Sequence, residues 1–358
     1  MCNIEIGSDF WEYDSKENNC ELELFKEEEF NKNSILVSSG RNSIRLLLEN
    51  LNLGKKILIP GFTCETVIEP FIDYGYEVEF YNIKKNLEVD LNDFNEKIKK
   101  FKPSLVLVHS YFGFNTLNNF WKYIKNNDFK FTDIVLIEDI TQIIFSNNIS
   151  SLAKYKIGSL RKWFAIPDGG VLTAKEMNFN SNHNENKKQI ELFIKACDLK
   201  AKYIDNNVDT KKIYREAFQE LKNEINKKTI FSMSKISKNV FLNNNFDYIK
   251  EKRIENYNIL YENLSDIENI EYLLGRANKN EIPLYFPILI KKNREEIQSE
   301  LAKNSIFCPI VWPKSKFVEK KIKFTTELIY EKILCIPCDQ RYSVKDMKRI
   351  IEVIRGIK

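Results

Sequence analysis

The feature that most constrains the fold is a repeated alternation of short apolar runs and helical patterns between residues 34 and about 175. Apolar residues fill consecutive positions in "KKILIP", "PSLVLVHS" and "DIVLIED", whereas "RNSIRLLLENLNL" spaces them at helical intervals. Continuous apolar runs are typical of strands that are buried on both faces of a parallel sheet. The alternation therefore predicts an α/β fold, with a large domain whose mainly parallel sheet is sandwiched by helices.

Four segments follow the expected strands at their carboxyl ends. They are "SSGRNS", "PGFTC", "HSYFGF" and "EDITQ". Right-handed crossovers place the carboxyl ends of parallel strands at one edge of the sheet, and ligands bind at that edge. We therefore expect these four segments to converge on one site.

The rest of the chain changes character twice. Residues from about 185 to 265 are mostly helical in pattern and rich in Lys, Asn and Glu. Beyond them, strand patterns in "IPLYFPILI", "SIFCPIV" and "ILCIPC" alternate with helical ones and end in a terminal helix. We expect an N-terminal arm over residues 1–33, a large domain over 34–240 and a smaller C-terminal α/β domain over 241–358.

Charge and cysteine content narrow the class of protein. The 55 basic and 51 acidic residues nearly balance, so we expect no nucleic-acid or membrane partner. We find no signal-peptide pattern and no apolar run near the roughly 20 residues of a membrane helix. The irregularly spaced cysteines, including Cys335 and Cys338, accompany only His109 and His183. We interpret the thiols as buried and reduced rather than as a metal site, which favours a cytoplasmic protein.

A carboxylate marks the end of one buried strand. In "VLIEDITQ", Asp139 follows the apolar run, where a carboxylate is costly without a partner. A pyridinium nitrogen is one such partner, because a paired carboxylate keeps that nitrogen protonated. Gln142 could then hydrogen-bond the oxygen substituent of the ring. The alternatives for Asp139 are a helix cap, a loop ion pair or a Mg²⁺ ligand.

The segment "VSSGRNSIRLL" fits a phosphate group. It passes from a strand through Ser-Ser-Gly into a helix, and the N–H groups at a helix N-terminus favour an anion. Gly40 allows a close approach, and Arg41 or Asn42 adds donors. The alternative is an ordinary helix cap by Ser38 or Ser39.

The stretch "IGSLRKWFAIPDGGVL" places Lys162 on a loop shortly before a Gly-Gly pair. A lysine that forms a Schiff base must be uncharged part of the time, and burial beside Trp163 and Phe164 would favour that form. The hydroxyl of Ser159 could donate to a phosphate. The alternative is a surface pair of Arg161 and Lys162 on a turn.

In this order, the segments resemble the DegT/DnrJ family of pyridoxal-phosphate-dependent sugar aminotransferases, which have aminotransferase fold type I. The resembling segments are "SSGRNSI", "IPGFTCETVIEPFIDYGYEVEFYNI", "VLVHSYFG", "LIEDITQ" and "RKWFAIPDGGVL". The resemblance is weaker in the C-terminal part and poor in the middle third, which indicates a divergent branch. It implies pyridoxal 5'-phosphate as the cofactor and a homodimer as the assembly.

The resemblance also implies roles for the matching residues. Lys162 would be the internal aldimine lysine and, once released, the base that moves a proton. Asp139 would face the pyridine nitrogen, and Gln142 would reach the side of the ring hydroxyl. Gly40 and Arg41 would offer backbone amides to the phosphate.

Several positions depart from the family pattern. The aromatic residue that stacks on the ring is matched here by Cys64, so Phe62, Tyr111 or Phe112 is expected to take its place. The serine usual five residues before the lysine is absent, and Ser159 lies three before it instead. His109, with Tyr111, could contact substrate or cofactor, and a satisfied histidine beside the sheet is the alternative.

The implied activity is an aminotransferase that moves an amino group from an amino acid such as glutamate to a keto sugar on a nucleotide carrier. The product would serve surface glycan or secondary metabolite synthesis. The retained lysine favours transamination, since dehydratase members of the family carry histidine there. The alternatives are a pyridoxal-phosphate-dependent decarboxylase or lyase that acts on a small amine or amino acid, and a non-catalytic member of the family.

Overall fold

The strand–helix alternation is present in the computed structural model, which describes residues 5–13, 33–127, 133–146, 152–174, 179, 182–206 and 208–357. Seven strands form one mixed sheet in the order β1-β7-β6-β5-β4-β2-β3, and a second sheet has the order β10-β9-β8. The described chain divides into two compact units. The first comprises Asp9–Leu51 and Lys154–Asn245, and the second comprises Glu5–Ser8, Asn52–Ala153 and Phe246–Lys358.

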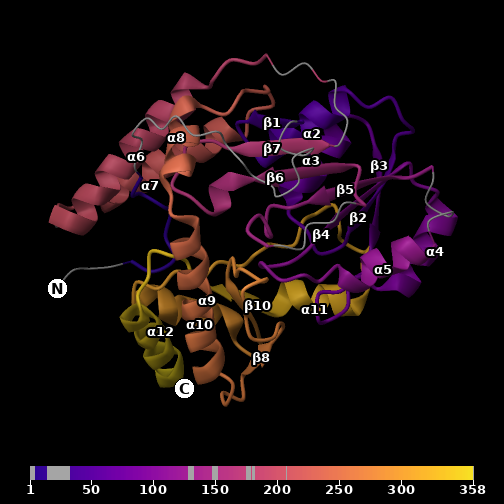
Figure 1. Cartoon of the computed structure of the whole chain (residues 1–358). Coiled ribbons are helices and arrows are strands. Elements are labelled where there is room, and N and C mark those ends of the chain that lie inside the picture. Colours follow the sequence, from indigo (N-terminus) through magenta and orange to yellow (C-terminus); the bar gives the residue numbers. More distant parts are fainter. Residues whose placement is uncertain are drawn as a thin grey trace. The chain divides into compact units, whose positions relative to one another are not determined.

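The first unit combines an antiparallel ladder with helices (Figure 1). Its elements are β1 (Ser34–Val37), α2 (Gly40–Glu49), β6 (Tyr155–Ser159), the short 3-10 helix η2 (Leu160–Lys162), β7 (Gly170–Ala174), α6 (Lys187–Asn206), α7 (Lys211–Ile225) and α8 (Lys235–Asn243). Strand β7 pairs antiparallel with both β1 and β6. Helices α6 and α7 pack side by side and bury Phe193, Phe218 and Leu221 between them.

The second unit contains the parallel strands and most of the crossover helices. These elements are β2 (Lys56–Pro60), α3 (Glu65–Asp73), β3 (Glu77–Tyr81), α4 (Leu91–Phe101), β4 (Leu105–His109), α5 (Asn118–Asn126) and β5 (Val135–Asp139). Strand β2 pairs parallel with β3 and β4, and β4 pairs parallel with β5. Every residue of β4 is buried, as the continuous apolar run predicts.

The C-terminal part of the second unit forms a smaller α/β layer. It consists of α9 (Phe246–Asn263), β8 (Ile270–Tyr272), β9 (Phe286–Ile290), α10 (Arg294–Lys303), α11 (Phe324–Lys332), β10 (Ile333–Ile336) and α12 (Val344–Gly356). Its three strands are antiparallel. A shared core contains Ile288, Leu301, Leu334 and Ile350.

Strand β7 is the exception to the parallel rule: it runs antiparallel to both β1 and β6, so β1 and β6 run in the same direction. One prediction from the sequence is wrong. The segment "SIFCPIV" is not a strand, and only Ile306 forms an isolated bridge, with Ile6. Pro309 explains the interruption, because it has no N–H for a ladder; its carbonyl accepts one hydrogen bond from Cys335 N at 3.0 Å.

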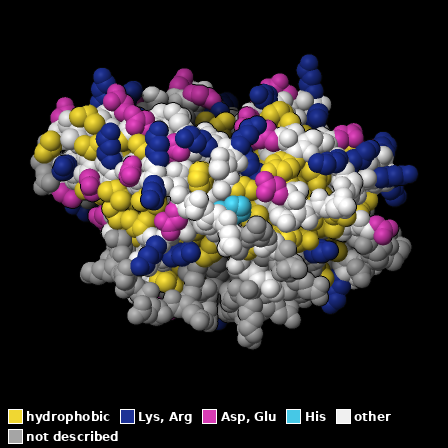
Figure 2. Space-filling view, turned by 90° about the horizontal axis from the view of Figure 1, so that it is seen from above, with side chains coloured by type: hydrophobic (Ala, Val, Ile, Leu, Met, Phe, Trp, Pro, Cys, Tyr) yellow, Lys and Arg dark blue, Asp and Glu magenta, His cyan; other side chains and the backbone are white. Residues whose placement is uncertain are grey.

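The outer surface mixes charges of both signs. On the face seen in Figure 2, basic side chains are interleaved with acidic ones and with hydrophobic patches. This distribution matches the near balance of 55 basic and 51 acidic residues in the sequence. Among the described residues, none of the helices has the length and apolar character needed to cross a membrane.

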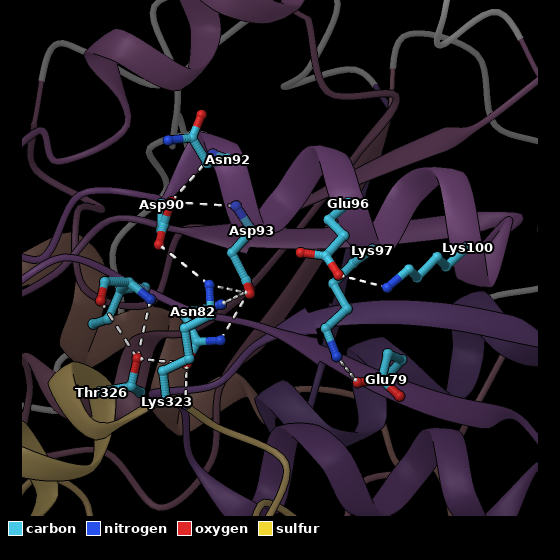
Figure 3. Close-up of polar contacts among 11 residues, drawn as sticks. Glu79, Asn82, Asp90, Asn92, Asp93, Glu96, Lys97, Lys100, Lys323 and Thr326 are labelled. Carbon is cyan, nitrogen blue, oxygen red and sulfur yellow. Dashed lines mark hydrogen bonds and ion pairs between the residues drawn. The ribbon is translucent and has the colours of Figure 1, made fainter.

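A buried polar network joins α4 to the segment before α11 (Figure 3). The Asp93 carboxylate accepts hydrogen bonds from the backbone N of Asn82 (2.7 Å) and from its Nδ2 (2.9 Å), and lies 2.8 Å from Lys323 Nζ. Asn82 Oδ1 accepts from Lys323 N at 2.6 Å and from the Thr326 hydroxyl at 3.1 Å. Burial raises the pKa of Asp93, but the Lys323 and Asn82 donors outweigh it and hold the pKa below its ordinary value.

We predict that Asp93→Ala lowers the free energy of unfolding by about 2 kcal/mol, since the variant removes three charge-assisted contacts and leaves buried donors unpaired. Urea unfolding at neutral pH measures the change. Glu96→Ala is the matched control, because Glu96 lies on the same helix but is exposed and pairs only with Lys100 (Figure 3). An equal loss in both variants would contradict the assignment.

Candidate active site

Three of the four predicted loops meet beyond the carboxyl ends of β2, β4 and β5 in the second unit. The register of the parallel strands pairs His109 of β4 with Asp139 of β5, so these two residues are neighbours on the same face. The Tyr111 hydroxyl donates to Phe62 O at 2.8 Å and ties the loop after β4 to the loop after β2. Of the predicted site residues, this unit brings together Phe62, Cys64, His109, Tyr111, Asp139 and Gln142. The fourth loop, with Gly40 and Arg41, belongs to the first unit.

Asp139 and Gln142 are buried and held by the loops around them. The side chain of Asp139 is 8% exposed, and its Oδ1 accepts a hydrogen bond from Thr141 N at 2.8 Å. This local turn fixes the orientation of the carboxylate at the strand end. Gln142 Oε1 accepts a hydrogen bond from Phe112 N, which anchors the loop after β4 to the loop after β5.

His109 is a neutral imidazole with both nitrogens used inside the protein. Burial lowers its pKa to about 4. Its Nδ1 lies 3.4 Å from Ser110 O and its Nε2 lies 3.2 Å from Thr63 Oγ1. A carbonyl only accepts, so Nδ1 carries the proton and Nε2 accepts from the Thr63 hydroxyl. These contacts are those of a satisfied histidine beside the sheet.

Aromatic rings cover the ends of β2 and β4. We call this cluster the aromatic wall, and it consists of Phe62, His109, Tyr111, Trp312 and Tyr330. Phe62 has its ring centroid 5.5 Å from that of Tyr111, 5.2 Å from that of Trp312 and 4.8 Å from that of Tyr330. The Tyr330 hydroxyl also accepts from Thr63 N at 2.9 Å.

Trp312 and Tyr330 were not predicted from the sequence, because they lie roughly 200 to 270 residues beyond the loops they cover. The only signal was the presence of aromatic residues within a lysine-rich segment.

The position that matches the stacking aromatic of the family is open to contact. Cys64 is half-buried, and its Sγ lies 3.0 Å from Thr66 Oγ1. Phe62 is fully buried within the aromatic wall, so its ring presents no face to a ligand. Tyr111 and Phe112 are buried as well. The three aromatic residues expected to replace the stacking residue are therefore buried, whereas Cys64, at the matching position, is half-buried.

In the first unit, the start of α2 forms a narrow backbone cradle. Ser39 caps the helix, and its hydroxyl accepts from Asn42 N at 3.2 Å. The first helical hydrogen bond runs from Ser43 N to Ser39 O, so the amides of Gly40 and Arg41 precede it. A Cβ at Gly40 would lie 3.2 Å from the Cβ of Ser159. The predicted phosphate residues Gly40 and Ser159 are therefore adjacent.

The side chains beside this cradle only partly match the predicted phosphate site. The Arg41 guanidinium donates to Asn226 Oδ1 at the end of α7, which directs it along the surface. The backbone amide of Arg41 lies in the first turn of α2, before the first helical hydrogen bond. Ser159 and Ile157 lie on the same face of β6, because side chains two residues apart in a strand share a face.

Lys162 lies in η2 with an exposed side chain. The expectation that Trp163 and Phe164 would enclose its amine is wrong. Both rings are buried, at 0% and 2% exposure, and Phe164 packs against Phe241 with ring centroids 5.0 Å apart. The two aromatic side chains anchor the loop in the core, while the lysine side chain projects from it.

A buried acid that the sequence analysis did not anticipate holds the Gly-Gly loop. Asp168 has no exposed surface, and its carboxylate accepts from Ser234 N (3.1 Å) and from the Ser234 hydroxyl (2.9 Å). Burial raises its pKa to about 6, although Ser237, Ser234 and the Arg161 charge lower it. Ser234 thus supports the loop from the N-terminus of α8.

Four of the five cysteines in the part of the chain that the structure describes are buried, as predicted, and Cys64 is half-buried. Cys308, Cys335 and Cys338 are buried, and burial raises the pKa of each thiol. Cys2 and Cys20 lie outside the described residues. No group of three or more His, Cys, Asp or Glu side chains within the described ranges is arranged to hold a metal ion.

Comparison with known proteins finds similarity at the level of structure. Neither a family model nor a curated protein matches the chain. Sugar aminotransferase CalS13 from Micromonospora echinospora is 14% identical with a TM-score of 0.65, over 91% of this chain and 88% of that chain. A DegT DnrJ EryC1 StrS aminotransferase from Brucella abortus is 16% identical with a TM-score of 0.61, over 90% and 85%.

A third match is the sugar aminotransferase Spr1654 from Streptococcus pneumoniae, whose structure is in a PLP form. It is 14% identical with a TM-score of 0.64, over 90% of this chain and 86% of that chain. The predicted fold is confirmed: the chain has the fold of the sugar aminotransferases, at an identity that fits a divergent branch.

We predict that Asp168→Asn changes the pH dependence of stability. The pKa of the Asp168 carboxyl is about 6 in the folded state, compared with an ordinary value of 3.8. Between these two pH values the carboxyl is protonated more in the folded state than in the unfolded state. Its contribution to stability is therefore full below pH 3.8 and is lost as the pH rises through 6. The free energy of unfolding of wild type minus variant should fall by roughly 2–3 kcal/mol over this interval. Chemical unfolding at several pH values measures it.

The exposed Asp209→Asn is the control in the same unit. A difference profile for Asp168→Asn that is as flat as the control profile would contradict the burial argument.

Proposed function

We propose that the chain is a pyridoxal-phosphate-dependent aminotransferase that moves an amino group from an amino acid such as glutamate to a keto sugar carried on a nucleotide. The observation that carries the proposal is the shared fold over about nine-tenths of the chain, in which the sequence retains a lysine at 162 and an acid at 139. The resemblance also supports a homodimer.

The residues present fit the proposed cofactor. A Cβ at Gly40 would lie only 3.2 Å from the Cβ of Ser159, so the cradle is tight there, and the amides at the start of α2 lie where an anion is favoured. Asp139 is a buried carboxylate at a strand end, which a pyridinium nitrogen would complement. The exposed amine of Lys162 is accessible to an aldehyde.

When bound, pyridoxal phosphate supplies an electron sink for the carbon that loses or gains a proton. We propose that Lys162 Nζ holds the cofactor covalently and later carries that proton. Asp139 keeps the pyridine nitrogen protonated, and Gln142 orients the ring from its hydroxyl side. Gly40, Arg41 and Ser159 bind the phosphate through two backbone amides and one hydroxyl.

Two alternative functions predict different outcomes at the same site. A decarboxylase or lyase would use the same lysine and acid, but would not leave the cofactor in its amino form after reacting with glutamate. A non-catalytic member would keep the fold as a binding or scaffold module and would not convert the cofactor. Stoichiometric conversion of the cofactor by an amino donor, followed by recovery with a keto sugar, distinguishes the transaminase from both.

We predict that Lys162→Ala abolishes the covalent attachment of the cofactor. Borohydride reduction of the wild type should fix the cofactor on the peptide that contains Lys162, as read by mass spectrometry. The variant should show no modified peptide and a circular dichroism spectrum like that of the wild type, since the side chain is exposed and contributes little to packing. Lys154→Ala, another exposed lysine of the same unit, is the control. Fixation on a different lysine would show that the residue is wrongly assigned.

We predict that Asp139→Ala slows the proton-transfer half-reaction by about 10²-fold or more, because the variant removes a preorganised charge opposite the ring nitrogen. The variant should also bind the cofactor more weakly. Stopped-flow absorbance with glutamate measures the rate, and Asp133→Ala, at an exposed position shortly before β5, is the control. A rate near that of the wild type would exclude the pyridine-nitrogen role.

A further inference from the structure

Trp312 occupies a distinct position among the tryptophans of the chain. The sequence has four of them, and Trp11, Trp121 and Trp163 are buried at 8%, 9% and 0% exposure. Trp312 is partly exposed. It forms the outer layer of the aromatic wall, because the residues beneath it, Phe62 and Tyr111, are almost fully buried. An aromatic residue with accessible surface over a packed cluster can contact a ligand.

Trp312 lies at the strand ends that form the candidate site. Its ring centroid lies 5.2 Å from that of Phe62 and 5.6 Å from that of His109, with interplanar angles of 61° and 79°. His109 is the neighbour of Asp139 across β4 and β5. Trp312 thus stands over β2 and β4, one strand away from the acid that we propose for the pyridine nitrogen.

The segment that carries Trp312 is fastened on both sides. Before it, Pro309 O accepts a hydrogen bond from Cys335 N of β10 at 3.0 Å. After it, the network of Figure 3 binds Lys323 and Thr326, and the Tyr330 hydroxyl donates to Gly61 O at 2.9 Å. Ile322 packs so tightly on Gly61 that a Cβ there would lie 2.6 Å from its Cγ2. The indole is therefore held in place, as a preorganised recognition surface requires.

The chemical character of the aromatic wall indicates which part of a ligand can bind to it. All members of the wall have aromatic rings. The imidazole of His109 is neutral, and both of its nitrogens have hydrogen-bond partners inside the protein. No member of the wall therefore carries a positive charge. A carboxylate or a diphosphate finds no counter-charge on the wall itself. An uncharged ring with C–H groups does fit, because the electron-rich face of an indole attracts such groups.

We propose that Trp312 is a specificity-determining residue of the acceptor site, whose exposed indole face stacks on the uncharged pyranose ring of the keto sugar. The inference rests on the proposed function and adds the surface that recognises the sugar. It also assigns the amino donor to another part of the site, since the carboxylates of glutamate would be desolvated without a partner on this wall.

Acrylamide quenching of tryptophan emission tests the proposal directly, because Trp312 is the most accessible of the four tryptophans. The probes are nucleotide-linked pyranoses without a ketone (UDP-N-acetylglucosamine, dTDP-glucose and GDP-mannose), each compared with its free nucleoside diphosphate. We expect at least one sugar nucleotide, and not its nucleoside diphosphate, to shield the quenchable emission of the cofactor-loaded protein. Trp312→Phe should remove this shielding, and Trp121→Phe, at a buried position in α5, should retain it.

Calorimetric titration with the same probe gives the second measurement. Trp312→Ala should weaken binding of the sugar nucleotide about tenfold, and Trp312→Phe about threefold or less, because a smaller aromatic face still stacks. The thermal unfolding of both variants reports whether the wall stays packed, and the Phe variant keeps the test valid if the Ala variant unfolds.

Shielding by a free nucleoside diphosphate equal to that by its sugar nucleotide would assign the indole to the base and overturn the proposal. Absence of shielding by every probe, or unchanged affinity in Trp312→Ala, would overturn it as well. The visible cofactor band of the wild type reports separately on the proposed function, since it requires no sugar. A protein with the band but without sugar shielding would retain the first proposal and lose the second.

Discussion

The parallel register of β2, β4 and β5 is the constraint on which the candidate site depends. Three strands that run in the same direction end at the same edge, so loops separated by up to about 80 residues in sequence meet there. This pairing makes Asp139 the neighbour of His109 and lets Gln142 anchor the loop after β4. A carboxylate, an amide and an aromatic cluster are fixed by backbone geometry before any ligand arrives.

The C-terminal part of the second unit completes this arrangement through contacts that are distant in sequence. Tyr330 from α11 hydrogen-bonds the backbone of the loop after β2, and Trp312 packs over the rings that the loops present. The Asp93 network fixes the same segment at the edge strand β3. Sugar recognition by Trp312 and the stability of this segment are therefore physically linked.

The sequence predicted those features that follow from local rules. The helical pattern of "RNSIRLLLENLNL" corresponds to α2, because an apolar stripe and the capping Ser39 are local features of the sequence. The burial of β4 and the strand-end position of Asp139 follow from one apolar run each. Features that depend on tertiary pairing were not accessible: β7 runs antiparallel between β1 and β6, and Trp312 joins the wall through a distant segment. Burial of Trp163 and exposure of Lys162 likewise depend on how the loop meets the core.

The central claim is that the acid at 139 and the amine at 162 act on one pyridine ring. The most direct measurement is the ¹⁵N NMR resonance of the ring nitrogen in protein loaded with isotopically labelled cofactor, recorded in mildly alkaline buffer. The account predicts the resonance of a protonated nitrogen in the wild type, together with the signal of cofactor bound to lysine. The resonance of an unprotonated nitrogen in the intact protein would contradict it.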